Sequence, residues 1–214
     1  MSATATITPP PQSAKPLAAS PPAAPRAAPQ PHRWTIREYR ELGKTGLFRD
    51  KKTMLLHGVL YVMVLPKPPH DTALNLAYEF LRAAFPTGHH VRNQQGFDIG
   101  TDTDPGPDLA VVSGAIRDYS GRTPTAAVLI VEVSDSSLFT DLTEKAELYA
   151  TAGVPEYWVV DLVNRQLVVF RDPTPLAKEL GATTYQTRLT FGPADAVSPI
   201  SAPSATITVS ELLP

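Results

Sequence analysis

Residues 126–137 read AAVLIVEVSDSS and begin with a nearly continuous apolar run. A nearly continuous apolar run is typical of a strand covered on both faces, because a strand with one wet face alternates apolar and polar residues. The following segment, DLTEKAELYATAG, has apolar residues at helical spacing, and Asp141 and Glu144 have the spacing of a capping box. EYWVVD is then a second apolar run. The pattern predicts strand, helix and strand in succession, with the helix over residues 141–152.

Other elements follow from apolar spacing and from the turn residues between them. They are a helix over 35–42 capped by Thr35, a hairpin over 53–65 that turns at His57-Gly58, a helix over 71–85 that opens at His70 or Asp71, strands over 89–100 and 107–112, a second hairpin around Asn164, and short peripheral strands after Pro173. The 71–85 helix is expected to bury Ala73, Leu76, Ala77, Phe80 and Ala84. Together these elements predict a mixed α/β domain with one central sheet flanked by helices.

Composition separates an N-terminal tail from this domain. Residues 1–33 are dominated by Pro and Ala, which prevents helix and sheet, so we predict a disordered tail there and a folded domain over 34–214. The chain has no cysteine, which excludes disulfides and thiolate metal sites. It also lacks a run of about 18 apolar residues and a signal-type start, so a cytoplasmic protein without a membrane span is expected.

Two acidic residues lie in segments that otherwise look like the middle of the sheet: Glu132 in LIVEVS and Asp108 in PDLAVV. Burying a carboxylate is costly unless it is paired or binds a metal. Consecutive strands are usually neighbours, so the two side chains can converge if they point to the same face. Hard oxygen ligands then favour Mg²⁺ or Mn²⁺. A structural ion pair is the alternative for Glu132, and a turn or strand-end role is the alternative for Asp108.

Lys145 lies on the predicted helix that follows Glu132. At about 100° per residue, it lies about 60° from the centre of the stripe formed by Leu142, Ala146 and Tyr149. It therefore borders the side that faces the sheet. From there its ammonium group can extend toward Glu132 and orient a water molecule or stabilise charge on a phosphate. By itself, such a lysine is more often a surface residue whose stem packs on apolar neighbours.

The segments PDLAVV, VLIVEVSDSS and DLTEKAELYATAGVPEYWVVD together resemble the Uma2 family of restriction endonuclease-like proteins. That family was formerly a domain of unknown function (DUF820) and belongs to the PD-(D/E)XK nuclease superfamily. The resemblance runs from about Trp34 to the end of the chain. It implies a restriction endonuclease-like core with metal-dependent phosphodiesterase activity, in which Asp108 and Glu132 are the acidic pair that holds Mg²⁺ or Mn²⁺.

The chain departs from the family pattern at two positions. The lysine that usually follows the Glu by two residues is Ser134 here, and Lys145 looks like that lysine moved to the next helix. In the first hairpin the family's E-L-I-D-G becomes residues 54–58, so Met54 stands at the acidic position and cannot bind a hard cation. His70 matches a family histidine at the start of the first core helix, although alone it would be a cap or surface residue.

Three functional hypotheses follow. The first is a Mg²⁺- or Mn²⁺-dependent endonuclease that cuts DNA, with Asp108, Glu132 and Lys145 as catalytic residues and His70 as an accessory. The second is a weakened nuclease fold kept as a binding or oligomerisation module, which Met54 favours. The third is a purely structural α/β protein in which these polar residues lie apart.

DNA is the partner that the nuclease hypothesis requires. Arg37, Lys44, Lys51 and Lys52 are candidates for contacts to its backbone. A symmetric homodimer suits an enzyme that cuts both strands, because two copies related by a twofold axis present two equivalent sites.

Overall fold

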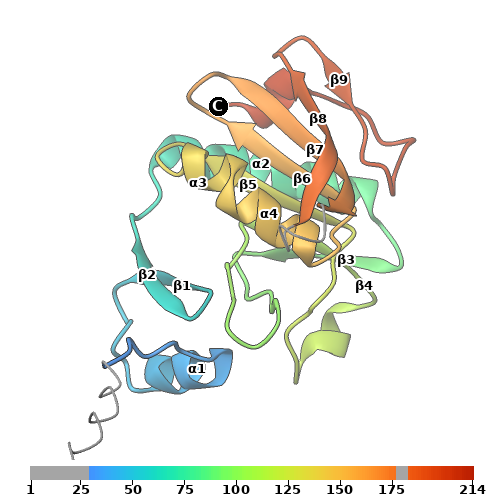
Figure 1. The fold of residues 1–214 in the computed structure, drawn as a ribbon. Coiled ribbons are helices and arrows are strands. Elements are labelled where there is room, and N and C mark those ends of the chain that lie inside the picture. Colours follow the sequence, from blue (N-terminus) through green and yellow to red (C-terminus); the bar gives the residue numbers. More distant parts are fainter. Residues whose placement is uncertain (1–28, 177–182) are drawn as a thin grey trace, which may run out of the picture. The chain divides into compact units, whose positions relative to one another are not determined.

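The computed structural model describes residues 29–176 and 183–214, and its central feature is a six-stranded mixed sheet (Figure 1). In spatial order the strands are β3 (His89–Asn93), β4 (Leu109–Ser113), β5 (Leu129–Ser134), β6 (Glu156–Asp161), β7 (Gln166–Pro175) and β8 (Thr183–Phe191). β5 and β6 are parallel, and the other neighbouring pairs are antiparallel. The predicted mixed α/β fold is confirmed. The predicted disordered tail lies almost entirely on residues 1–28, outside the described residues.

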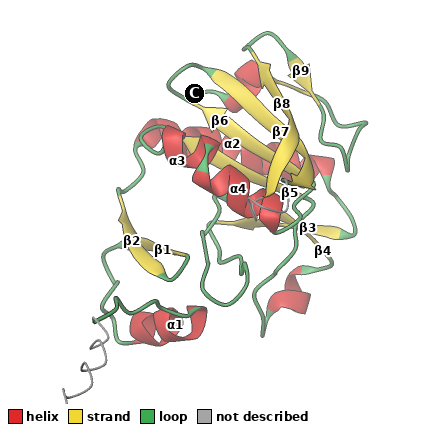
Figure 2. Cartoon of the chain, viewed as in Figure 1, coloured by secondary structure: helices red, strands yellow, loops and turns green. Residues whose placement is uncertain are grey.

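Helices cover both faces of this sheet (Figure 2). α2 (Pro68–Ala84) packs on one face, together with Leu129, Val131 and Val133 of β5. α4 (Glu144–Thr151) packs on the other face, together with Ile130. All six residues of β5 are buried, as expected for a strand covered on both sides. Because side chains alternate along a strand, Glu132 points to the same face as Ile130, toward α4.

A helix and a separate two-stranded hairpin precede the sheet. α1 (Ile36–Lys44) begins with a capping box, in which Thr35 and Glu38 each accept a backbone N–H of the other. The hairpin pairs β1 (Lys52–Leu56) with β2 (Val59–Met63). Its turn at His57-Gly58 has positive φ at both residues, 49° and 71°, as a type I′ hairpin turn requires. The predicted helix and hairpin are confirmed.

Gly58→Ala is expected to destabilise the protein more than Gly88→Ala, although φ is similar at the two glycines, 71° and 73°. A Cβ at Gly58 would lie 2.9 Å from the Cβ of Arg33 and 3.1 Å from the backbone of Trp34, whereas a Cβ at Gly88 meets nothing within 4 Å. Gly88→Ala therefore measures the left-handed backbone alone, about 1–2 kcal/mol, and crowding at Gly58 should add about 1 kcal/mol or more. Chemical denaturation compares them, and equal losses would contradict the crowding.

The predicted single helix over residues 141–152 is wrong. The structure has two helices, α3 (Leu138–Leu142) and α4, separated at Thr143, where φ of −123° and ψ of −83° leave the helical region. Asp141 is consequently no N-terminal cap. It is a buried residue near the end of α3.

Boundaries elsewhere also differ from the prediction. α2 begins at Pro68 rather than at His70 or Asp71. Proline is well suited to the first positions of a helix, because the backbone N–H that it lacks would have no hydrogen-bond partner within the helix there. Leu76 is 39% exposed, and the buried face instead includes Leu74 and Leu81.

Two predicted strands are shorter in the structure. The strand expected over 89–100 ends at Asn93. Near the C-terminus, β9 (Ala196–Val197) pairs with β10 (Ile207–Thr208), and a 3₁₀ helix over Val209–Leu212 follows where further strand was predicted. A second 3₁₀ helix, Ile116–Tyr119, lies in the loop after β4.

Candidate active site

Asp108 and Glu132 lie side by side on the α4 face of the sheet. Leu109 pairs with Val131 in the β4–β5 register, so Asp108, immediately before β4, falls opposite Glu132. The N–H of Asp108 donates to Oε2 of Glu132 at 3.4 Å, and the N–H of Val133 donates to Oδ2 of Asp108 at 3.0 Å. The two residues are 4% and 2% exposed. The sheet therefore brings these two carboxylates together in a buried position.

Side chains from three further elements surround the carboxylate of Asp108. Nε2 of His70, in the first turn of α2, lies 3.2 Å from Oδ2. Lys52 on β1 donates to Oδ1 at 3.3 Å, and the side-chain amide of Gln94, just after β3, donates to the same oxygen at 3.2 Å. With the N–H of Val133, both oxygens of Asp108 are hydrogen-bonded and its orientation is fixed.

Two side chains of α4 contact the carboxylate of Glu132. Nζ of Lys145 lies 3.0 Å from Oε1 of Glu132, and the hydroxyl of Tyr149 donates to the same oxygen at 2.6 Å. Lys145 and Tyr149 are one helical turn apart, so they share a face of α4. The Lys145 side chain is 5% exposed. Its ammonium group therefore points at Glu132 and not at solvent.

A third carboxylate, Asp141, completes this cluster, so the helix-cap role predicted for it from the sequence is wrong. Its Oδ1 lies 3.0 Å from Nζ of Lys145. Its Oδ2 accepts hydrogen bonds from the hydroxyls of Ser134 and Ser137 at 2.7 and 2.6 Å. Ser134 thus supports Lys145 through Asp141. The spacing of Asp141 and Lys145, four residues apart, was the available sequence signal for this pair.

Burial and neighbouring charges set the protonation states. Burial raises the pKa of Glu132 to about 7, although the charge of Lys145 opposes the shift. Burial also favours a higher pKa for Asp108, but the hydrogen bond from His70 and the charge of Lys52 outweigh it and hold that pKa well below its usual range. Burial disfavours the charged form of Lys145, yet its carboxylate neighbours more than compensate, so the pKa of Lys145 is raised. Lys145 is therefore a cation.

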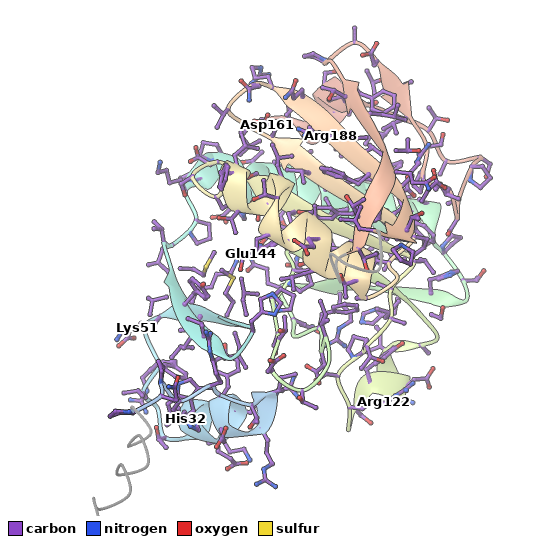
Figure 3. All side chains as sticks on the ribbon, viewed as in Figure 1. His32, Lys51, Arg122, Glu144, Asp161 and Arg188 are labelled. Carbon is purple, nitrogen blue, oxygen red and sulfur yellow. The ribbon has the colours of Figure 1, made fainter. Side chains whose placement is uncertain are left out.

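These groups form the floor of a cavity of about 290 Å³, which the hairpin, the start of α2 and the loop before α3 enclose. The predicted residues that line it are Lys52, Met54, His70, Asp108, Glu132 and Lys145. Arg37, Lys44 and Lys51 are exposed and do not line this cavity. Figure 3 labels Lys51 at the outer margin of the hairpin. Lys52 is thus the residue of the four proposed DNA contacts that enters the site.

The cavity offers a metal few protein ligands. Within residues 29–176 and 183–214, no three or more His, Asp or Glu side chains are grouped to hold a metal. Met54 is 6% exposed and packs with Leu56 and Leu148, so it adds no hard ligand. Mg²⁺ is commonly held by one or two carboxylates, with water and substrate phosphates in the remaining positions. Asp108 and Glu132 therefore fit Mg²⁺ or Mn²⁺ better than Zn²⁺ or Ca²⁺, which take more protein ligands.

Comparisons with known proteins agree with this architecture. None of the described helices has the length and apolar character needed to cross a bilayer. No curated protein matches the chain. One similar solved structure is titled "Crystal structure of a putative nuclease belonging to DUF820 from Anabaena variabilis ATCC 29413", with a TM-score of 0.66 and 15% identity over 84% of this chain and 97% of that one. At this identity the similarity concerns the fold.

The sequence also matches a family model. That model is Uma2, described as "Putative restriction endonuclease", and it covers residues 36–209, from the first residue of α1 to the 3₁₀ helix near the C-terminus. The resemblance inferred from the sequence motifs is confirmed. This chain belongs to the Uma2 family.

Proposed function

We propose that this cavity is the active site of a metal-dependent endonuclease that hydrolyses DNA phosphodiester bonds. The observation that carries the proposal is the meeting of Asp108, Glu132 and Lys145, from three different elements, at the floor of one open cavity. Buried charges of this kind are costly for folding, and they are typical of functional sites. Family membership and the similarity in fold support the same class of enzyme.

The residues of the cavity have distinct roles in this proposal. A bound Mg²⁺ or Mn²⁺ supplies a water molecule of lowered pKa and neutralises charge on the scissile phosphate. Asp108 and Glu132 would hold the ion, and His70 and Tyr149 keep their carboxylates in place. Because Lys145 is a cation, it donates hydrogen bonds and does not act as a base. Its proposed role is to orient the attacking water or stabilise a phosphate oxygen.

DNA is the proposed substrate. Its scissile phosphate would enter the cavity, and the flanking nucleotides would lie on the surface outside it. The exposed Arg37, Lys44 and Lys51 are proposed contacts to its flanking phosphates. We also propose a cytoplasmic location and a symmetric homodimer, which would present two such cavities to the two strands. Light scattering on the purified chain tests the dimer.

Purified full-length protein is expected to cleave DNA with Mg²⁺ or Mn²⁺ and to lose this activity with EDTA or with Asp108→Asn. Replacing a residue that merely orients a metal ligand typically lowers activity by about 10–100-fold. Replacing Asp108, which would hold the metal itself, should lower the cleavage rate by more than that. Single-stranded, duplex and branched oligonucleotides would be compared on a gel. Asp50→Asn is the matched control, because Asp50 is exposed and does not line the cavity. Equal cleavage by Asp108→Asn and the parent would contradict the proposal.

Met54 favours a second candidate function, a nuclease fold retained as a binding or oligomerisation module. Its side chain lines the cavity at the position where the family pattern has an acid. Calorimetry separates the two functions, because an active site should bind Mn²⁺ and lose it in Asp108→Asn. A chain that binds DNA but no metal would favour the module.

A further inference from the structure

The two lysines of the cavity are held very differently. Nζ of Lys145 lies 3.0 Å from each of two carboxylates, and its side chain is 5% exposed. Lys52 contacts Oδ1 of Asp108 at 3.3 Å, and its side chain is 31% exposed. Strong charge-assisted hydrogen bonds are shorter, about 2.7–2.9 Å. Lys145 is therefore fixed in the protein, whereas Lys52 is loosely held and accessible to an arriving ligand.

The carboxylates that would hold a metal already have lysines as partners. Lys52 contacts Asp108, and Lys145 contacts Glu132 and Asp141. A lysine ammonium group beside a carboxylate repels a divalent cation that approaches the same carboxylate, which lowers the Coulomb energy gained by metal binding. Metal binding is therefore favoured when Lys52 leaves Asp108 or when an anion arrives with the metal.

Met54 explains why Lys52 takes Asp108 as its partner. Residues two apart on a strand share a face, and both Lys52 and Met54 line the cavity. An acid at position 54 would be a second partner for Lys52 beside Asp108. A thioether carries no charge and accepts hydrogen bonds only weakly. Lys52 consequently pairs with Asp108, the same carboxylate that would bind the metal.

We propose that Lys52 is the phosphate-binding residue of this cavity, and that its transfer from Asp108 to a substrate phosphate frees that carboxylate for the metal. The inference rests on the proposed function. Asp108 keeps His70, Gln94 and the N–H of Val133 when Lys52 leaves, so no buried carboxylate is left without donors. Metal and phosphodiester then bind cooperatively, and each raises the affinity for the other by the same factor.

Calorimetric titration of the full chain with Mn²⁺ tests this coupling without relying on cleavage. Dimethyl phosphate, a minimal phosphodiester, is expected to raise the Mn²⁺ affinity of the parent about fivefold or more. Lys52→Met and Lys52→Gln should bind Mn²⁺ at least about fivefold more tightly than the parent without phosphate, and dimethyl phosphate should add nothing. Arg49→Met is the matched control: it removes the same charge from an exposed residue that does not line the cavity, and it should bind Mn²⁺ as the parent does.

Two results would overturn the inference, and they are distinguishable. Tight Mn²⁺ binding that neither dimethyl phosphate nor the Lys52 variants alter would remove the coupling and leave the metal-dependent function intact. No Mn²⁺ binding by the parent or by either Lys52 variant, with or without dimethyl phosphate, would overturn both. An increase in Mn²⁺ affinity in Arg49→Met equal to that in Lys52→Met would assign the effect to net charge instead of to the contact with Asp108.

Discussion

Replacing Glu156 with alanine is expected to lower the free energy of unfolding by about 3–5 kcal/mol, because it leaves a partly buried guanidinium without its carboxylate. Glu156 is fully buried at the start of β6. Its Oε1 accepts from Trp158 and twice from Arg171, and its Oε2 accepts from the N–H of Ile200. One carboxylate thus joins two strands of the sheet to the C-terminal segment.

Thermal and chemical denaturation measure this loss, which corresponds to about 2–4 °C in Tm per kcal/mol for a chain of this size. Glu41→Ala is the control, because Glu41 forms an exposed pair with Lys44 that should contribute no more than about 1 kcal/mol. Glu156 lies on the α2 face by strand alternation with Trp158, away from Asp108 and Glu132. The fraction that remains folded should therefore keep its Mn²⁺ affinity. A loss below about 1 kcal/mol would contradict the proposed anchoring role.

Lys145→Met is expected to reduce DNA cleavage by about 10²–10³-fold, the usual cost of removing one donor that stabilises developing charge. The change also leaves Glu132 and Asp141 without their shared cation, so stability should fall as well. Gel-based cleavage rates would be measured below the melting temperature of the variant, at a fixed fraction folded. Lys145→Arg, which keeps the charge with a different shape, should recover part of the rate.

Lys67→Met separates the role of Lys145 from general charge effects at the cavity. Lys67 lines the same cavity, but its side chain is 66% exposed and pairs with Asp135 at 3.2 Å on the surface. Its removal should change the cleavage rate less than tenfold, because it touches neither candidate metal ligand. A folded Lys145→Met that cleaves within tenfold of the parent would rule out a direct role for Lys145 in the reaction.

Local pattern was enough to predict most elements of the fold. The continuous apolar run of β5 and the turn residues His57-Gly58 and Asn164 correctly predicted a central sheet and two hairpins. Helix ends were less well predicted, because capping patterns occur by chance. Asp141 and Glu144 have capping-box spacing, yet the helix breaks between them and buries Asp141 beside Lys145. Tertiary pairing with Lys145 outweighed the local capping preference.

The sequence by itself placed Asp108 and Glu132 in two consecutive buried strands, which are usually neighbours, so that their carboxylates could converge if they shared a face. The pairing of Leu109 with Val131, which puts both on one face, came from the tertiary structure. Helical spacing in the sequence indicated where Lys145 would point. Only the tertiary structure decided which other side chains reach these three. Lys52, Gln94 and His70 come from separate elements, and their contacts with Asp108 depend on how the hairpin, α2 and the sheet pack together, which no local pattern encodes.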